Sequence, residues 1–568
     1  MIHTINTKQD FLDLKQYVSS HYGQPPKKLT KSGQYVLQWD SHESFVLNMK
    51  DYDSNLRAEV FTWTKDLEVQ PKPNDALVFG KNEISHIVGC EVEDHETILY
   101  REIGGQVVEE SIPNKLWLIG SRQFDNSWKR LDGNLTYKFI KYYNTKKEFF
   151  QDRKRYNPES TWSVGDMKEA SMLLNGFTYF KGMKVKDVSI LSFDLETAGL
   201  VHNSSAQILL ISNTFRKGET FVRKLFAIDD FKSEAEMLLS WCNWVQGLNP
   251  AIVSGFNIYG FDFPYLNFRA QVLGIELNLG RNGSPLTFSK RTSKFRKDGS
   301  QDYDYTRCFI YGREIVDMMF VSYHYDIGRK YEKYALKSIV EQEGMTRPGR
   351  QFYESGSIAA NWYNLEERAK IKIYAEDDAD DVIKLWDLMM PSYFYLNQNV
   401  PKSCQAVNYS ATGSIVNSFL VRSYLQIGHS LPKSDVAEKF EGAISDGYPG
   451  LYSNVFKVDV ASLYPSIILQ YEIYNKKKDP NAHFLKMVEF FTKARLENKK
   501  KAEETGDGYY NDLSEAGKTF INSAYGLLGT NHLLFNSPAD GALVTDYGRQ
   551  ILKKAVLWAS GQEYIPSS

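Results

Sequence analysis

The sequence has few cysteines and no long apolar run. Roughly 18 consecutive apolar residues are needed to cross a bilayer, and no segment of this 568-residue chain approaches that length. Its polar N-terminus is unlike a signal peptide. The four cysteines, Cys90, Cys242, Cys308 and Cys404, lie far apart without the spacing of metal ligands. We therefore expect a cytoplasmic protein with reduced thiols and no membrane partner.

An excess of charge of one sign is absent too, since the net charge is −2. The length allows several domains with large cores. Any affinity for nucleic acid must come from local basic faces, which acidic metal sites would offset in the total. The basic, aromatic segment from Lys141 to Arg155 predicts a solvated amphipathic helix, with nucleic-acid contact as the alternative. The basic residues from Lys290 to Lys297 are expected to form a flexible loop.

Two carboxylates follow a buried-strand pattern in the middle of the chain. The apolar run 188–193 leads directly into Asp194-Leu195-Glu196. Residues two apart in a strand face the same side, so Asp194 and Glu196 would project together. Two carboxylates on one face repel unless a cation neutralises them, which predicts a metal site. An isolated Asp-x-Glu is common, however, and would be weak evidence alone.

Two later segments supply further acids. Asp262 follows the strand-like run 251–256 at an expected helix start. Tyr374 and Asp378 are four residues apart in a helical stretch and would share a face. Each piece has a structural alternative: Asp262 as a helix cap, Tyr374 as a half-buried aromatic and residues 376–378 as a solvated acidic face. Their combination and order favour a functional site.

These three segments resemble the three motifs of the DnaQ-like 3′–5′ exonuclease domain. The resemblance implies an RNase H-like sheet with helices around it, and two divalent ions that activate a water and stabilise the leaving 3′-oxygen. Residues 334–340 also resemble the stretch between the second and third motifs. The resemblance assigns metal binding to four acids, Asp194, Glu196, Asp262 and Asp378. It assigns orientation of the water to Tyr374, and contact with DNA to Asn257 and Phe261.

A second set of motifs lies in the last third of the chain. The strand-like run 455–458 ends at Asp459, and a turn then leads into an expected helix that contains Pro465. Proline is tolerated near a helix start because the amide proton it lacks would be unpaired there. A strand-end aspartate can hold Mg²⁺, and the amides of the following turn can bind phosphate. Taken alone, this run could equally be a buried strand with a capping aspartate.

Two helices are expected downstream, over 483–504 and after a turn at 505–508. Arg495 and Lys499 share a face of the first helix. Lys518, Asn522 and Tyr525 share a face of the second. An antiparallel pair could direct these groups at a triphosphate. The neighbouring basic residues 500–501 are expected to be solvated.

These segments resemble family B DNA polymerases over roughly residues 130–560. Residues 440–444 resemble the linker between exonuclease and palm, although Ala443 replaces the second glycine of many relatives. The resemblance implies a multidomain fold of mixed α/β and α+β class. The expected parts are a β-rich N-terminal domain (1–185), the RNase H-like exonuclease domain (186–395), the first part of the palm (396–471), helical-hairpin fingers (472–530) and a continued but incomplete palm without a thumb (531–568).

The same resemblance assigns roles in nucleotide binding. Asp459 and Val460 would bind catalytic Mg²⁺, for which Mn²⁺ can substitute. The backbone of Ser462, Leu463 and Tyr464 would hold the triphosphate of a deoxynucleoside triphosphate. The Tyr464 ring would lie under the sugar, where a 2′-hydroxyl would clash. The remaining nucleotide contacts implied by the resemblance are Arg495, Lys499, Lys518, Asn522 and Tyr525. The DNA contacts are Gly442 and Ala443.

One expected element is missing, since no Asp-Thr-Asp-like hairpin follows Arg549. Asp540 is expected in a turn and Asp546 at a helix start, so neither replaces it. Two-metal phosphoryl transfer needs both ions held. We therefore expect the N-terminal part of a replicative, proofreading DNA polymerase of phage type, in the host cytoplasm, which acts on primer-template DNA once a second polypeptide completes the palm. A truncated chain or an interrupted gene would lack the same chemistry.

Two alternatives differ in which motifs they use. The first is a stand-alone 3′–5′ exonuclease with a palm-like platform that only holds DNA. The second is a non-catalytic subunit. The complete set of exonuclease acids argues against the second alternative. Tyr464, Lys518 and Asn522 argue against the first, because a platform needs no grip on a triphosphate.

Overall fold

The computed structural model describes most of the chain as two compact units, residues 1–78 and 79–568. The residues described are 2–21, 27–31, 34–38, 44–68, 75–78, 80–296, 302–326, 328–436, 441–444, 447, 450–455, 460 and 462–560. Among them, none of the helices is long and apolar enough to cross a bilayer. The boundary predicted at residue 185 falls inside the second unit, so the domain limits within 79–568 stay predictions.

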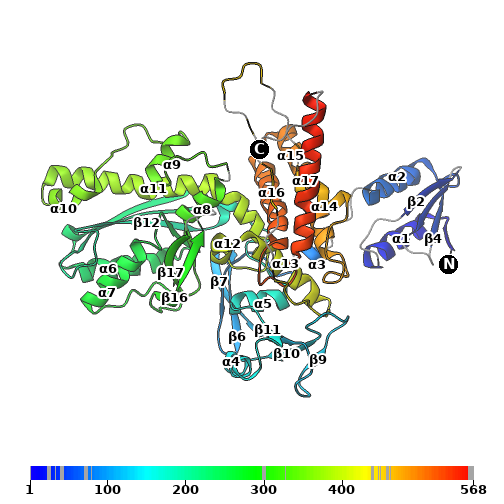
Figure 1. Ribbon diagram of the computed structural model, residues 1–568, viewed down its shortest axis with the longest axis horizontal. Coiled ribbons are helices and arrows are strands. Elements are labelled where there is room, and N and C mark those ends of the chain that lie inside the picture. The colour runs from blue at the N-terminus through cyan, green and yellow to red at the C-terminus, as the bar shows by residue number, and fades with distance from the viewer. Residues whose placement is uncertain are drawn as a thin grey trace. The chain divides into compact units, whose positions relative to one another are not determined.

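The first unit is a four-stranded sheet with helices packed against it (Figure 1). Its strand order is β1-β4-β3-β2, and β1 is parallel to β4 while the other neighbours are antiparallel. Phe11, Leu37, Leu47 and Val60 form its buried core. Its elements are β1 (Ile2–Ile5), α1 (Lys8–His21), β2 (Lys27–Lys31), β3 (Gln34–Gln38), β4 (Ser44–Asn48), α2 (Ser54–Glu68) and α3 (Asp75–Val78).

The second unit begins with two small antiparallel sheets. One has the order β5-β6-β7 and the other β11-β8-β10-β9. The helix expected over 141–155 is confirmed only for Lys146–Arg155, which form α4, because residues 141–143 belong to β10. Thr145 caps α4 by accepting from the Glu148 amide at 3.1 Å. The elements are β5 (Ile87–Val92), β6 (Glu96–Ile103), β7 (Gln106–Pro113), β8 (Leu116–Gly120), β9 (Lys129–Arg130), β10 (Phe139–Tyr143), α4 (Lys146–Arg155), β11 (Thr161–Trp162) and α5 (Met167–Asn175).

A five-stranded mixed sheet follows, with the order β14-β13-β12-β15-β18. β12 is parallel to β15 and antiparallel to β13. Helix α11 lies along one face of the sheet, and α6 and α7 lie on the other (Figure 1). The strands and main helices are β12 (Ile190–Thr197), β13 (Ile208–Lys217), β14 (Thr220–Ala227), α6 (Glu234–Leu248), β15 (Ile252–Gly255), α7 (Asp262–Leu273), β18 (Glu314–Asp317) and α11 (Leu365–Asn397).

The central strand β12 separates two kinds of side chain. Leu191, Phe193 and Leu195 join the hydrophobic core on the α6–α7 side. Ser192 points the other way, and its hydroxyl donates to the Ala379 carbonyl of α11 at 2.6 Å. Because side chains alternate along a strand, Asp194 and Glu196 also face α11.

The basic segment 290–296 is not a loop, contrary to our prediction. It belongs to β16 (Thr287–Arg296), which pairs with β17 (Asp302–Phe309) as a two-stranded ribbon. Phe295 stacks on Phe320 with ring centroids 4.0 Å apart, and this apolar contact explains why the segment is ordered. Lys297 lies outside the described residues. Shorter elements of this part are α8 (Met318–Tyr325), α9 (Leu336–Gln342) and α10 (Ile358–Asn361), with 3₁₀ turns at 185–187, 228–230 and 355–357.

The last part of the unit is helical. α15 and α16 form the expected antiparallel pair, and Asp507 caps α16 by accepting from the Tyr509 amide at 3.0 Å. A Cβ on Gly413 would lie 2.8 Å from the Gly526 carbonyl oxygen, so α13 and α16 approach through their backbones. The elements are α12 (Cys404–Tyr409), α13 (Thr412–Gln426), α14 (Leu463–Gln470), α15 (His483–Thr505), α16 (Gly508–Leu528) and α17 (Pro538–Ser560).

Candidate active site

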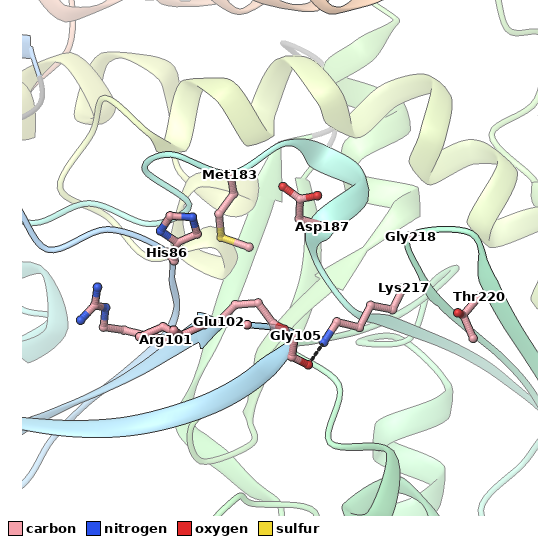
Figure 2. Close-up of a pocket in the computed structure, with 11 residues that line it drawn as sticks. His86, Arg101, Glu102, Gly105, Met183, Asp187, Lys217, Gly218 and Thr220 are labelled. Atoms are coloured by element: carbon pink, nitrogen blue, oxygen red, sulfur yellow. Dashed lines mark hydrogen bonds and ion pairs between the residues drawn. The ribbon is translucent and has the colours of Figure 1, made fainter.

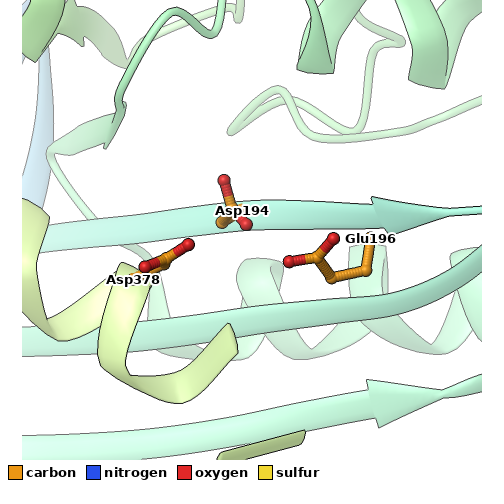
Figure 3. A group of neighbouring side chains, drawn as sticks. All are labelled: Asp194, Glu196 and Asp378. Carbon is orange, nitrogen blue, oxygen red and sulfur yellow. The ribbon is translucent and has the colours of Figure 1, made fainter. Parts of the chain in front are cut away.

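Three carboxylates meet where α11 crosses β12. Asp194 and Glu196 come from β12 and Asp378 comes from α11, and Figure 3 shows all three facing one space. One oxygen atom of each lies within 4.8 Å of those of the other two. Glu196 is 7% exposed and Asp378 is 5% exposed. The structure thus brings together three of the four acids predicted as metal ligands.

Burial raises the pKa of each of these carboxyl groups. Removal from water raises the pKa of Asp194 to about 8; the Asp378 charge adds to this shift and Lys337 opposes it. The pKa of Glu196 lies well above its usual range because of burial and of the charges of Asp194 and Asp378. Clustered carboxylates can all be ionised only beside a compensating cation. A donor set made of carboxylate oxygens suits a hard divalent ion such as Mg²⁺ or Mn²⁺.

Asp262 lies beside this cluster without joining it. It begins α7, is 2% exposed, and its Oδ1 accepts from the Leu195 amide of β12 at 3.2 Å. That amide lies between the two acids of β12 in sequence. Burial and the nearby Asp194 charge raise the Asp262 pKa well above its usual range. Asp262 therefore faces the same pair of acids from the end of α7.

Both oxygens of Asp378 contact a cation. Lys337 Nζ of α9 lies 3.1 Å from Oδ2 and also donates to the Tyr374 hydroxyl. Arg350 Nη2 donates to Oδ1. Lys337 lies in the segment 334–340 whose resemblance we noted, but its contact with Asp378 was not predicted. Arg350 was missed entirely because no motif includes it.

The turn before α7 is held by Asp317 at the end of β18. Its carboxylate accepts from the Asn257 amide at 2.8 Å and the Tyr259 amide at 3.1 Å. Asn257 has φ of 64°, a conformation that asparagine tolerates better than most residues. Tyr303 of β17 donates to Asn257 Oδ1 at 2.8 Å. Asn257, predicted to contact DNA, thus has its side chain held by the β16–β17 ribbon.

Phe261, the second predicted DNA contact of this region, precedes Asp262 directly. Its ring lies 5.3 Å from the Tyr265 ring, so it packs partly onto α7. Neither Asp317 nor Tyr303 was predicted, and only the tertiary fold brings these two residues to the turn.

The second predicted site is described in part. Asp459 lies outside the described residues, while Val460 is 45% exposed. Ser462 directly precedes α14 with φ of 55°, and its side chain makes no capping hydrogen bond to the helix. Its hydroxyl accepts from Arg495 Nη1 of α15. The Tyr464 ring lies 4.7 Å from the Tyr525 ring of α16. The turn therefore contacts both helices of the α15–α16 pair.

The other predicted nucleotide contacts face solvent or acids of their own helix. Lys518 Nζ lies 3.0 Å from Glu515, and Lys499 Nζ lies 3.9 Å from Glu503. Asn522 is exposed. Leu463, whose backbone was assigned to the triphosphate, is the first residue of α14. These positions are compatible with a site open to a ligand from outside.

Gly442 and Ala443 are described, and both are exposed. Arg549 of α17 donates to the Gly442 carbonyl at 2.8 Å and to the Glu441 carbonyl at 2.9 Å. This contact joins the predicted linker to α17. Phe440 of the same linker lies outside the described residues.

Asp540 and Asp546 both lie within α17, which corrects two expectations. Asp540 is in the first helical turn and not in an isolated turn, and it accepts from the Ser537 hydroxyl at 2.6 Å. Asp546 is inside the helix and not at its start, and it lies 3.1 Å from Arg549. The helix extends through both positions because the proline of the Pro-Ala-Asp-Gly sequence begins it.

A cavity of about 680 Å³ opens elsewhere, between the β6–β7 and β13–β14 turns (Figure 2). Lys217 contacts Glu102 and donates to the Gly105 carbonyl at 2.6 Å on its wall. None of the residues predicted as catalytic, metal-binding or ligand-binding lines it.

The comparisons with known proteins agree on one family. Residues 142–339 match the family model described as DNA polymerase family B, exonuclease domain. This range contains Asp194, Glu196, Asp262 and Lys337, and ends before Asp378. The chain is 23% identical over 411 residues to DNA polymerase 2 of Aeropyrum pernix, covering 66% of this chain and 48% of that protein.

Other relatives show the same partial coverage. The DNA polymerase of Thermococcus gorgonarius is 25% identical, with 65% of this chain matched to 51% of that protein. The DNA polymerase delta catalytic subunit of Schizosaccharomyces pombe is 27% identical, with 65% matched to 39%. The chain thus spans about half the length, or less, of the curated relatives it matches.

A solved structure shares the fold. The family B DNA polymerase from the hyperthermophilic archaeon Pyrobaculum calidifontis superposes with a TM-score of 0.66 at 17% sequence identity. The match covers 83% of this chain and 71% of that chain. The predicted fold class, mixed α/β and α+β in a multidomain chain, is confirmed.

Proposed function

Because the chain belongs to DNA polymerase family B, we propose that it removes nucleotides from the 3′ end of DNA in order to proofread DNA synthesis. The observation that carries this proposal is the cluster of Asp194, Glu196 and Asp378. Three neighbouring carboxylates, of which Glu196 and Asp378 are buried and Asp194 is partly buried, are unfavourable in their charged forms unless a cation lies among them. Their pKa shifts and their proximity support a site for divalent ions.

The reaction would divide between bound metal and the protein's own groups. Two Mg²⁺ ions, for which Mn²⁺ can substitute, would supply an activated water and stabilise the leaving 3′-oxygen. Asp194, Glu196 and Asp378 would hold the ions, with Asp262 at the start of α7 as a further ligand. Tyr374 would help to orient the water through its hydroxyl, to which the Lys337 ammonium donates.

DNA would reach this site along the turn before α7. Asn257 and Phe261 are the proposed contacts, and they sit within five residues of Asp262. The turn is fixed by Asp317 and by Tyr303, so these two side chains position the DNA contacts without touching the metal.

The last third of the chain would bind a deoxynucleoside triphosphate and primer-template DNA. The contacts of Ser462 with Arg495 and of Tyr464 with Tyr525 support this proposal, since they join the turn to the helix pair. Asp459 and Val460 would hold Mg²⁺ there. The further ligand contacts proposed are Leu463, Lys499, Lys518 and Asn522 for nucleotide, and Gly442 and Ala443 for DNA.

We also propose that synthesis needs a further palm carboxylate and a thumb, which residues 1–568 do not supply. No Asp-Thr-Asp-like hairpin follows Arg549, and two-metal transfer needs both ions held. Asp540 accepts from Ser537, which precedes α17, and Asp546 pairs with Arg549 of α17, so both are poor substitutes.

The exonuclease proposal is tested with single-stranded DNA labelled at its 5′ end. With Mg²⁺ or Mn²⁺ the purified chain should shorten this DNA from the 3′ end. Asp194→Ala should slow the reaction by orders of magnitude, because it removes a metal ligand worth several kcal/mol in the transition state. Asp229→Ala removes an acid that pairs with Lys372 away from the cluster, and should cleave like the wild type. Equal rates for the Asp194→Ala variant and the wild type would refute the assignment.

A further inference from the structure

Two arginines between α9 and α10 bind acids on one side of α11. Arg347 donates to Asp377 through Nε and Nη2, both at 2.9 Å. Arg350 donates through Nε to Asp381 Oδ2 at 2.8 Å, and through Nη2 to Asp378 Oδ1. Arg347 therefore binds both oxygens of a single acid, whereas Arg350 bridges two acids, and only Arg350 reaches a proposed metal ligand.

Arg350 is held much more firmly than the other cation beside Asp378. Its side chain is 1% exposed, and Nη1 donates to the Gln351 carbonyl at 2.7 Å, so each of its nitrogens has a partner. Asp381 is equally buried and also binds Lys384 at 2.7 Å. Lys337, which contacts the other oxygen of Asp378, is 33% exposed.

This difference gives the two oxygens of Asp378 different tasks. Oδ1 is fixed by a planar guanidinium that also bridges to Asp381, one helical turn further along α11. Oδ2 faces an ammonium on a flexible, partly exposed stem, which can move away when another cation arrives. Groups that orient a ligating carboxylate typically change metal affinity when they are replaced.

We propose that Arg350 is a positioning residue of the metal site, which holds Asp378 Oδ1 and so presents Oδ2 to a divalent ion. The proposal rests on the proposed exonuclease function, since it takes Asp378 as a ligand. The bridge to Asp381 is essential to it, because a single charged contact would leave the carboxylate free to rotate.

Binding of Mn²⁺ to the full-length chain, measured by electron paramagnetic resonance, tests the proposal without relying on activity. Arg350→Lys keeps the charge but cannot bridge two carboxylates. It should weaken Mn²⁺ binding by about tenfold or more, as is typical when a group that orients a metal ligand is replaced. Arg347→Lys is the control, because Arg347 binds Asp377, the neighbour of Asp378 on α11, and this variant should bind Mn²⁺ within about twofold of the wild type. Equal affinities for both variants would overturn the proposal.

Nuclease rates against Mn²⁺ concentration give a second readout. Arg350→Lys should raise the Mn²⁺ concentration for half-maximal rate, while the rate at saturating Mn²⁺ returns towards that of the wild type. A general loss of folding would lower the saturating rate instead. Circular dichroism shows whether Arg350→Lys is folded. If it is not, Asp381→Asn is the variant to measure instead. It keeps Arg350 and Asp378 but weakens the bridge, and unchanged Mn²⁺ affinity in a folded Asp381→Asn variant would also overturn the proposal.

The failure of this inference is distinguishable from the failure of the proposed function. If Asp194→Ala binds Mn²⁺ as well as the wild type does, or if the wild type binds none, the metal site itself is refuted and the inference falls with it. If the wild type binds Mn²⁺ and Arg350→Lys binds it equally well, only the positioning role is refuted.

Discussion

Replacing Arg269 with methionine should loosen the loop that follows Glu196. Arg269 of α7 and Glu234 of α6 form an ion pair in which the side chains are 2% and 1% exposed. Arg269 also donates to the Ser204 carbonyl of that loop at 2.8 Å, and Glu234 accepts from the Ile208 amide at 2.9 Å. The pair therefore joins α6, α7 and the β12–β13 connection beside the proposed metal ligands.

The size of the effect follows from burial. Removing one partner of a buried ion pair leaves a charge without compensation, which costs about 3–5 kcal/mol. At about 1.4 kcal/mol per tenfold change, local opening should become more frequent by roughly two to three and a half orders of magnitude. The exposed pair of Lys372 and Asp229 is a matched control, because Lys372→Met should cost only about 0–1 kcal/mol.

Hydrogen–deuterium exchange of the full-length chain measures this opening locally. Peptides covering residues 198–210 should lose protection in Arg269→Met and keep it in Lys372→Met. The double variant Arg269→Met/Glu234→Leu removes both charges and should regain much of the protection. If Arg269→Met exchanged no faster than Lys372→Met, the ion pair would not hold the loop and the reasoning would be refuted.

Three further predictions concern nucleotide choice, synthesis and pH. Tyr464→Ala, in any reconstituted polymerase, should raise ribonucleotide relative to deoxyribonucleotide incorporation by about tenfold, because it removes a steric block worth roughly 1–3 kcal/mol; unchanged discrimination in single-nucleotide assays would exclude this role. Residues 1–568 alone should extend a primed template negligibly, and robust templated extension would show that another carboxylate completes the site. Burial lowers the pKa of His324 to about 4. The unfolded chain therefore takes up this proton first as the pH falls from 6.5 to 4, and stability should fall by up to about 3 kcal/mol. In urea unfolding at pH 7 and pH 4.5, His324→Gln should lose less stability than the wild type; an equal loss would exclude His324 as the cause.

The local structure around the metal cluster could be predicted from sequence because it depends on short spacing. Asp194 and Glu196 share a face since strand residues two apart always do. Tyr374 and Asp378 share one since four residues make about one helical turn. The order of apolar runs and acids then fixed which elements carry the site. Both statements need only the period of a strand and of a helix.

The cations of the site could not be predicted in this way. Arg350 reaches Asp378 from 28 residues away in sequence, through a segment without regular secondary structure. Asp317 and Tyr303 reach Asn257 from separate strands. Such contacts depend on how the elements pack, and no local pattern of residue types encodes them. The ribbon of β16 and β17 was missed for a related reason, since its many basic residues obscure the apolar contacts of Phe295 with Phe320 and Tyr323.

The carboxylate cluster depends on the rotation of α11 about its axis as much as on the position of this helix. A slip of one residue turns a helix by about 100°, which would carry Asp378 away from β12. Hydrophobic contacts alone do not fully prevent such a slip, because large and small apolar side chains can repack. Directional bonds resist rotation on several sides of this helix. Ser192 donates to the Ala379 carbonyl at 2.6 Å, and Thr214 donates to Asp380 at 2.7 Å.

The Ser192 and Thr214 contacts come from β12 and β13, and the Arg347 and Arg350 contacts come from the segment between α9 and α10. Rotation in either direction would therefore break buried hydrogen bonds, each costing about 1–3 kcal/mol when a partner is left unsatisfied. The aspartates at 377, 380 and 381 thus have a purpose although they bind no proposed metal. They fix the face of α11 that Asp378 occupies, which explains why an acidic run rather than a single aspartate surrounds the third motif.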